Sequence, residues 1–153
     1  MLFRAVVAWM KASAPGQPPE CEPGWSDRRI GEAIRHAPLL FVCHPDRLQG
    51  TVDWFLSDEY TGGDVAVMHK VAASLRSNPS VLMASLHFRL RPRHAYAMQH
   101  RQQWCPPAAL FSLTDERFCK KIGGSVLELK EFKQKHEATY CSIVTETAEE
   151  ADV

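Results

Sequence analysis

The residue types best suited to chemistry in this chain are arginines that gather near its middle. The stretch from Asn78 to Arg101 reads N-P-S-V-L-M-A-S-L-H-F-R-L-R-P-R-H-A-Y-A-M-Q-H-R and contains no acidic residue. A guanidinium group binds phosphate through a planar fork of donors, and cations that neutralise phosphates give a salt-dependent affinity for nucleic acid. We therefore predict a nucleic-acid-binding surface formed by Arg89, Arg91, Arg93, Arg101, Arg35 and Lys70. The alternative, which stays open at this level, is that these cations solvate a face or cap the carboxyl ends of helices.

Histidine and cysteine offer a second kind of chemistry, a metal site. His87, His94, His100 and Cys105 lie close together in the sequence. No two of the histidines have the i, i+4 spacing of a helical zinc clamp, and the motif H-E-x-x-H is missing. We therefore predict surface or helix-capping histidines and no metal ion.

A catalytic site would need a nucleophile and a base, and Cys43 next to His44 is the one pair that invites this interpretation. Neighbours on a turn seldom face each other, and catalytic groups are recognised by geometry rather than adjacency. The sequence has no phosphate-binding loop, no dinucleotide fingerprint and no nucleophile elbow. We expect a packed thiol, no enzyme and no cofactor.

The four tryptophans could stack on bases, but their positions favour packing. They fall at expected helix starts and within the apolar periodicity, and they are Trp9, Trp25, Trp54 and Trp104.

Composition is ordinary for a globular chain of 153 residues, with a net charge of zero. The charge is uneven, because residues 1–104 hold 12 Lys/Arg against 9 Asp/Glu and residues 105–153 hold 6 against 9. A basic body with an acidic tail is a modest indication of a polyanionic partner. The five cysteines are odd in number and irregularly spaced, which indicates reduced thiols rather than a disulfide framework. No apolar run is long enough to cross a bilayer.

The elements that position these residues are predicted to be helices. Helix-capping residues and apolar steps of three and four predict helices over residues 26–37, 44–57, 64–77, 85–101 and 112–123, with Pro92 interrupting the fourth. A final helix is expected over residues 126–136, followed by a frayed or disordered acidic tail over residues 139–153. The predicted apolar stripes include Ile34 and Val65, and the short segment Leu39–Val42 is expected to be buried.

Two of the connections between these helices have similar sequences. P-L-L-F-V-C-H begins at Pro38 and P-S-V-L-M-A-S begins at Pro79, so both read P-x-x-[L/F]-x-x-[S/H]. Helix, short apolar turn and helix therefore occur twice, with a unit length near the roughly 30 to 40 residues of known helical repeats.

The order of these segments resembles the mTERF family of mitochondrial transcription termination factor-like proteins, in particular its plant branch. The resemblance lies in G-W-S-D-R-R-I-G-E-A-I-R-H-A-P-L-L, D-R-L-Q-G-T-V-D-W-F-L, N-P-S-V-L-M-A-S-L-H-F-R-L-R-P-R-H and L-T-D-E-R-F-C-K-K, which together span residues 24–121. Arg89 and Arg93 match the arginines of the family's third segment. The resemblance implies an organellar protein of the mitochondrion or plastid that binds double-stranded DNA or RNA in transcription termination or regulation, or in RNA processing.

Together these observations predict an all-α fold in which stacked mTERF-like repeats form a short curved solenoid. The predicted organisation is the end of a preceding repeat (1–11), a proline-rich linker (12–23), a repeat domain (24–122), and a divergent helix with an acidic tail (123–153). We expect a monomer without membrane association, whose further partners are organellar transcription or ribosome-assembly proteins. The alternative is a protein-interaction scaffold, or a truncated repeat protein that does not bind nucleic acid, because about two and a half repeats form only a small groove.

Overall fold

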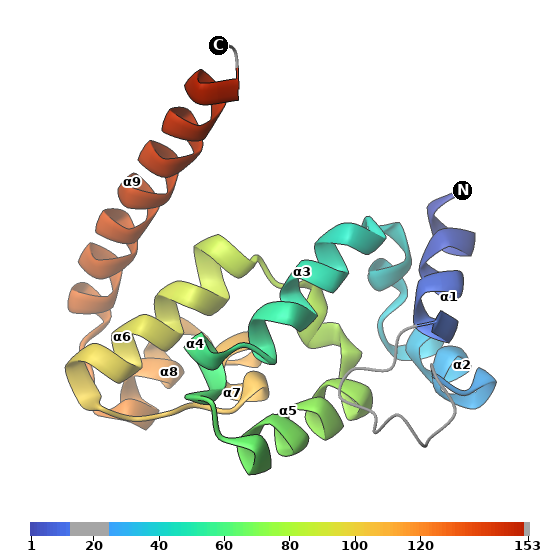
Figure 1. Cartoon of the computed structure of the whole chain (residues 1–153). Coiled ribbons are helices and arrows are strands. Elements are labelled where there is room, and N and C mark those ends of the chain that lie inside the picture. The colour runs from blue at the N-terminus through green and yellow to red at the C-terminus, as the bar shows by residue number, and fades with distance from the viewer. Residues whose placement is uncertain (13–24, 152–153) are drawn as a thin grey trace. The chain divides into compact units, whose positions relative to one another are not determined.

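A computed structural model describes the backbone of residues 1–12 and 25–151 and the side chains of residues 1–12 and 25–139. Within these ranges all regular secondary structure is helical, as the sequence predicts (Figure 1). The elements are α1 (Leu2–Ala12), α2 (Asp27–His36), η1 (Pro38–Val42), α3 (Pro45–Phe55), α4 (Asp58–Thr61), α5 (Val65–Ser77), η2 (Pro79–Met83), η3 (Leu86–Leu90), α6 (Arg91–Arg101), α7 (Pro107–Ser112), α8 (Asp115–Ile122) and α9 (Val126–Ala151). The predicted linker falls almost wholly on residues outside the described ranges. None of the described helices combines the length and apolar character that a membrane crossing requires.

The chain divides into two compact units, Met1–Ala84 and Ser85–Val153. The predicted repeat domain, residues 24–122, therefore spans the division, and α1 belongs to the same unit as α2. Each unit is described by itself below.

The first unit is built around the short 3₁₀ helix η1, which contacts α1, α2 and η2. Leu40 and Phe41 of η1 are buried in its core. At the other end of α3, the rings of Trp54, Phe55 and Tyr60 pack with centroids about 5 Å apart. Such aromatic clusters add to the stability gained from buried apolar area.

The repeated sequence motif forms the same local structure at both of its positions. η1 and η2 are both five-residue 3₁₀ helices that begin with a proline. The preceding residues, Ala37 and Asn78, have φ of −138° and −136°, because a residue before proline is excluded from the α region. The motif then ends in the cap of the next helix, His44 in the first copy and Ser85 in the second.

Helix starts and stops follow local side-chain chemistry. Ser26, Asp64 and Thr114 each accept a hydrogen bond from a backbone N–H in the first turn of the helix that follows. Gly123 ends α8 with a positive φ of 72°, a conformation that glycine adopts at little cost. The sequence-based expectation is confirmed at these positions.

The second unit is organised around η3 and α6. η3 is a π-helical turn, and α6 continues from it with Pro92 in its first turn, so the proline restarts the helix instead of breaking it. Leu90, Tyr96 and Ala97 are buried, and α6 packs against α9 while η3 contacts α7 and α9. α9 extends beyond the other helices of its unit (Figure 1).

Several expectations about burial and length are wrong. Leu39 and Val42 are 66% and 64% exposed, although their neighbours Leu40 and Phe41 are buried, and Ile34 and Val65 are also exposed. The reason is that only one side of a 3₁₀ turn or of a helix packs against the core, and side chains on its other side stay exposed to solvent. The last helix continues to Ala151, well past the predicted end at residue 136.

Candidate functional site

Arg93 lies in the core of the second unit and not on its surface. Its side chain is only 1% exposed. Nη1 donates to the carbonyl oxygen of Leu110 at 2.8 Å, and Nη2 donates to Oδ1 of Asp115 at 2.7 Å. The guanidinium also lies over the ring of Phe118, 5.0 Å from its centroid. Arg93 therefore fastens α6 to the connection between α7 and α8.

Arg89 performs the same task one helical turn earlier. Its Nη2 donates to the carbonyl oxygens of Phe111 and Leu113, at 2.7 and 3.1 Å. These carbonyls belong to the last turn of α7 and the loop after it, where helical carbonyls lack partners. Partial burial, and then the nearby charge of Arg93, lower the pKa of Arg89 from its ordinary value.

Asp115 is the acidic partner at this junction. It begins α8 and accepts bonds from Arg93 and from Nζ of Lys133, the latter at 2.9 and 3.1 Å. Partial burial alone would raise the pKa of Asp115, but the hydrogen bonds from Lys133 and Arg93 outweigh it and lower the pKa. Three helices, α6, α8 and α9, thus meet at one carboxylate.

These contacts correct part of the predicted binding surface. Arg93 and Arg89 are brought together, but their guanidinium groups point at backbone carbonyls, so the helix-capping alternative describes both. Arg91 is half-buried and Arg101 is exposed at the end of α6. Arg35 and Lys70 are exposed on α2 and α5 of the first unit.

The exposed face of α8 carries cations that the sequence prediction did not select. Arg117, Lys120 and Lys121 are exposed and lie at i, i+3 and i+4, so they share one side of the helix. The opposite side, with Phe118, Cys119 and Ile122, is buried. In the part of the chain that the structure describes, none of the three cations forms an ion pair. The sequence R-F-C-K-K could have indicated this basic face, because its two lysines follow the arginine by three and four positions and its two apolar residues fall between them.

This basic face lies next to the loop that follows Arg101. Lys121 acts electrostatically on the thiol of Cys105, although burial has the larger effect and raises the pKa of that thiol. Residues 85–136 hold ten Lys/Arg and four Asp/Glu, a net charge of +6. The whole second unit, residues 85–153, holds ten Lys/Arg and nine Asp/Glu, so its net charge is only +1. Its excess of positive charge lies in residues 85–136, because the other five acids follow residue 136.

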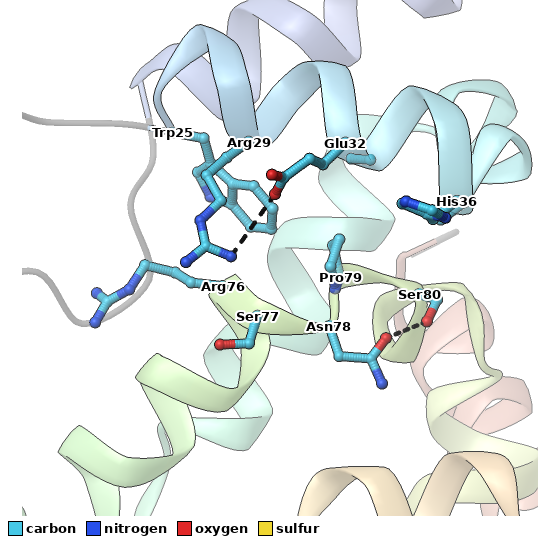
Figure 2. A pocket seen from close by; sticks show the side chains of 11 residues that line it. Trp25, Arg29, Glu32, His36, Arg76, Ser77, Asn78, Pro79 and Ser80 are labelled. Carbon is cyan, nitrogen blue, oxygen red and sulfur yellow. Dashed lines mark hydrogen bonds and ion pairs between the residues drawn. The ribbon is translucent and has the colours of Figure 1, made fainter.

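The first unit contains a polar groove between α2 and the turn that joins α5 to η2. Its volume is about 180 Å³, and Figure 2 shows α2 on one side and the turn on the other. The lining residues are Trp25, Arg29, Glu32, Ala33, His36, Ala37, Arg76, Ser77, Asn78, Pro79 and Ser80. Arg29 forms an ion pair with Glu32 at 4.0 Å, and the hydroxyl of Ser80 donates to Oδ1 of Asn78.

The equivalent turn at η1 is lined by apolar residues. A shallow hollow beside it is formed by Met1, Leu2, Phe3, Ile34, Pro38, Phe41 and Val42. With Leu39, this gives an exposed apolar patch over α1, α2 and η1. We call it the η1 patch.

Cys43 and His44 do not form a nucleophile–base pair. The thiol of Cys43 donates to the carbonyl oxygen of Leu39, and Nδ1 of His44 accepts from the backbone N–H of Asp46. No cluster of three or more His, Cys, Asp or Glu suited to a metal ion occurs within the described residues. Trp25 and Trp54 are buried, Trp9 bonds Gln49 through its indole, and Trp104 is 37% exposed.

No family model, curated protein or solved structure matches this chain.

Proposed function

We propose that this protein binds nucleic acid through an exposed cationic surface on its second unit, in mitochondrial or plastid gene expression. The observation that carries the proposal is the basic face of α8, where Arg117, Lys120 and Lys121 are exposed and unpaired among the described residues. Arg101, exposed at the end of α6 in the same unit, is proposed as a further phosphate contact. Cations placed in this way neutralise phosphates and release counterions.

The arginine pair that resembles the family motif has a supporting part in this proposal. Arg89 and Arg93 hold the α7–α8 connection against α6, and thereby fix the direction of the α8 face. From the sequence resemblance to mTERF proteins we also propose that the helical repeats stack into a short solenoid. The same resemblance suggests the role, which is transcription termination or regulation, or RNA processing. Arg35 and Lys70 are proposed as additional phosphate contacts from the first unit.

Binding should be tested by fluorescence anisotropy with duplex DNA and single-stranded RNA across a salt series. The test variant is Arg117→Ala/Lys120→Ala/Lys121→Ala. If the three side chains contact phosphates, the slope of log K against log salt should become shallower by about 2 to 3 for duplex DNA. The preference between DNA and RNA is read from the same titrations.

The matched control is Arg4→Ala/Lys11→Ala/Arg28→Ala, which removes three exposed charges from the first unit. It should leave the slope nearly unchanged. Absence of binding at low salt by a chain that is helical by circular dichroism would remove the proposal, and so would an equal loss in both variants.

A second function, protein docking, is favoured by the η1 patch. Six exposed apolar side chains gather there, from Met1, Leu2, Phe3, Ile34, Leu39 and Val42. Contiguous apolar surface of this kind is typical of interaction sites. If nucleic acid does not bind, the scaffold function should be tested by crosslinking at Leu39 replaced by a photoreactive residue.

A further inference from the structure

Two arginines of this chain make the same contact, one in each unit. Nη2 of Arg47, in the first turn of α3, donates to the carbonyl oxygen of Met83 at 2.9 Å. Nη2 of Arg89 donates in the same way to the carbonyl oxygen of Phe111 at 2.7 Å. Met83 is the last residue of η2, and Phe111 lies in the last turn of α7. Each arginine therefore caps the carboxyl end of a short helix that comes later in the chain, where carbonyl groups lack partners.

The two capped helices and η1 share one sequence pattern. They begin with Pro38, Pro79 and Pro107, and each buries the second and third residues after its proline. In both capped helices the bonded carbonyl belongs to the fourth residue after the proline, and the corresponding residue of η1 is Val42. α7 is thus a third copy of the P-x-x-[L/F] motif. The buried pairs are Leu40 and Phe41, Val81 and Leu82, and Ala109 and Leu110.

The two arginines also occupy equivalent places in the sequence. Arg47 follows the helix cap His44 by three residues, and Arg89 follows the cap Ser85 by four. The extra residue in the second case belongs to the π-helical turn η3, whose hydrogen bonds span one residue more than those of an α-helix. In both helices the residue after the arginine is fully buried, and these residues are Leu48 and Leu90.

The third copy carries an arginine at the same position. Thr114 caps α8, Arg117 follows it by three residues, and the next residue, Phe118, is fully buried. No further motif of this kind follows in the sequence, since Pro107 is its last proline. Arg117 is exposed, and its guanidinium has no hydrogen bond or ion pair within the residues that the structure describes. It is a capping arginine that has no helix end to cap.

The carboxyl end of η1 is the opposite case. Met83 and Phe111 are half-buried, whereas Val42 is 64% exposed. α1 packs against η1, but no side chain in the described part of the chain donates to the carbonyl oxygen of Val42. Leu39 of the same turn is 66% exposed, at a position where the other two copies have serine and alanine. η1 is therefore a helix end without a capping arginine, within the apolar η1 patch.

We infer that the start of α8 in one copy of this chain docks on the η1 patch of a second copy, with Arg117 donating to the carbonyl oxygen of Val42. The inference rests on the docking function proposed for the η1 patch and names its occupant. A second copy fits because this chain offers both the unused arginine and the uncapped helix end. Within each unit, α3 contacts η2 and η3 contacts α7, so the proposed contact repeats one that the fold already forms twice.

This association joins two different surfaces, so it is heterologous. A pair of copies leaves one α8 and one η1 patch free, and the assembly should therefore grow with concentration. It departs from the monomer that the sequence analysis expects. A copy docked through Arg117 keeps Lys120 and Lys121 of the α8 face for nucleic acid.

Sedimentation velocity of the full chain, without nucleic acid and up to about 0.5 mM, tests the association. The sedimentation coefficient of the unchanged chain should rise with concentration. Arg117→Gln should weaken association by about tenfold or more, because it removes a charge-assisted hydrogen bond. Lys130→Gln is the charge-matched control, since Lys130 is exposed on α9 of the same unit, and it should associate like the unchanged chain.

The other surface is tested with Val42→Lys. An ammonium group beside the Val42 carbonyl repels Arg117, so this variant should also lose association. Val65→Lys is the matched control, because Val65 is a valine of the first unit that is 61% exposed and lies outside the η1 patch. It should associate like the unchanged chain.

Mixing Arg117→Gln with Val42→Lys separates this contact from any other. The first variant keeps an intact η1 patch and the second keeps Arg117, so a single contact can form between them. The mixture should contain a dimer with one copy of each variant and nothing larger, although neither variant associates alone. Formation of that dimer also shows that both variants are folded.

The inference is overturned if the unchanged chain stays monomeric at the highest concentration, or if the mixture forms no dimer. It is also overturned if either control loses as much association as the variant it is matched to. Because no nucleic acid is present, these results do not depend on the proposed nucleic-acid function. A monomeric chain that still crosslinks to another protein at Leu39 would retain the docking function and exclude a second copy as the occupant.

Discussion

Nη2 of Arg93 lies 2.7 Å from Oδ1 of Asp115, inside the second unit. Arg93 is 1% exposed, while Asp115 retains 40% of its side-chain surface. The arginine side chain is thus almost completely buried, whereas the carboxylate that neutralises its charge remains partly exposed to solvent. Breaking such a pair from one side leaves a buried charge or a buried carbonyl without its partner, which is costly.

Arg93→Ala should therefore destabilise the chain by about 3 kcal/mol, measured by urea unfolding followed by circular dichroism. Arg93→Lys should recover only part of this, because an ammonium lacks the planar fork that reaches both Leu110 and Asp115. Arg101→Ala is the control, since its side chain is exposed, and should change stability by less than about 0.5 kcal/mol. Equal stability of Arg93→Ala and Arg101→Ala would contradict the structural role of Arg93 in holding α7 and α8 against α6.

Acid should weaken the second unit through Asp115. Its pKa is lowered in the folded chain, so the carboxylate contributes stability above its ordinary pKa and loses that contribution as the pH falls through the folded value. The free energy of unfolding should fall below about pH 4. Asp115→Asn should be less stable at neutral pH and should show a smaller decrease in acid.

The measurement for this pH dependence is amide hydrogen exchange of α6 and α8 at several pH values, corrected for intrinsic rates. The first unit reports on general acid effects in the same sample. If the free energy of unfolding falls as steeply with decreasing pH in Asp115→Asn as in the unchanged chain, the effect comes from other carboxylates.

Gly124→Ala should destabilise the second unit by about 1 to 3 kcal/mol. A Cβ at this position would lie 2.8 Å from the hydroxyl oxygen of Tyr96 and 3.0 Å from Cε1 of its ring. Tyr96 is buried, and its hydroxyl bonds Ser125 and Glu128, so it cannot move aside without breaking those bonds.

Gly50→Ala should stabilise the chain instead. Nothing lies within 4 Å of its Cβ, and the position is helical, so thermal unfolding should show a gain of about 0.5 to 1 kcal/mol.

Neighbouring residues of η1 should respond very differently to substitution. Phe41→Ala removes a buried ring and should cost about 3 to 5 kcal/mol of stability. Leu39→Lys, two positions earlier, changes an exposed side chain and should leave urea unfolding nearly unchanged. If the η1 patch mediates association, sedimentation velocity should show less of it for Leu39→Lys. A stability loss of Leu39→Lys as large as that of Phe41→Ala would mean that Leu39 is covered.

The local features of the fold could be predicted from the sequence because each depends on a few adjacent residues. Ser26, Asp64 and Thr114 cap helices by bonding backbone groups two or three residues away. Pro38 and Pro79 restrict the residue before them, so both copies of the motif form the same 3₁₀ turn. The all-helical character and the repeated helix, turn and helix follow from such short-range effects and from the apolar periodicity.

The partners of side chains across the fold depended on the tertiary structure alone. Periodicity places Ile34 on the same stripe as Ile30, but it does not say how far the covering elements reach, and Ile34 remains exposed. The arginines show this most clearly. Arg89, Arg93 and Arg101 have the same chemistry in the sequence, and each could solvate, cap or bind. Packing of α7 and α8 against α6 places carbonyls and Asp115 at the first two and leaves the third in water, because burial of a charge depends on which partners the fold brings to it.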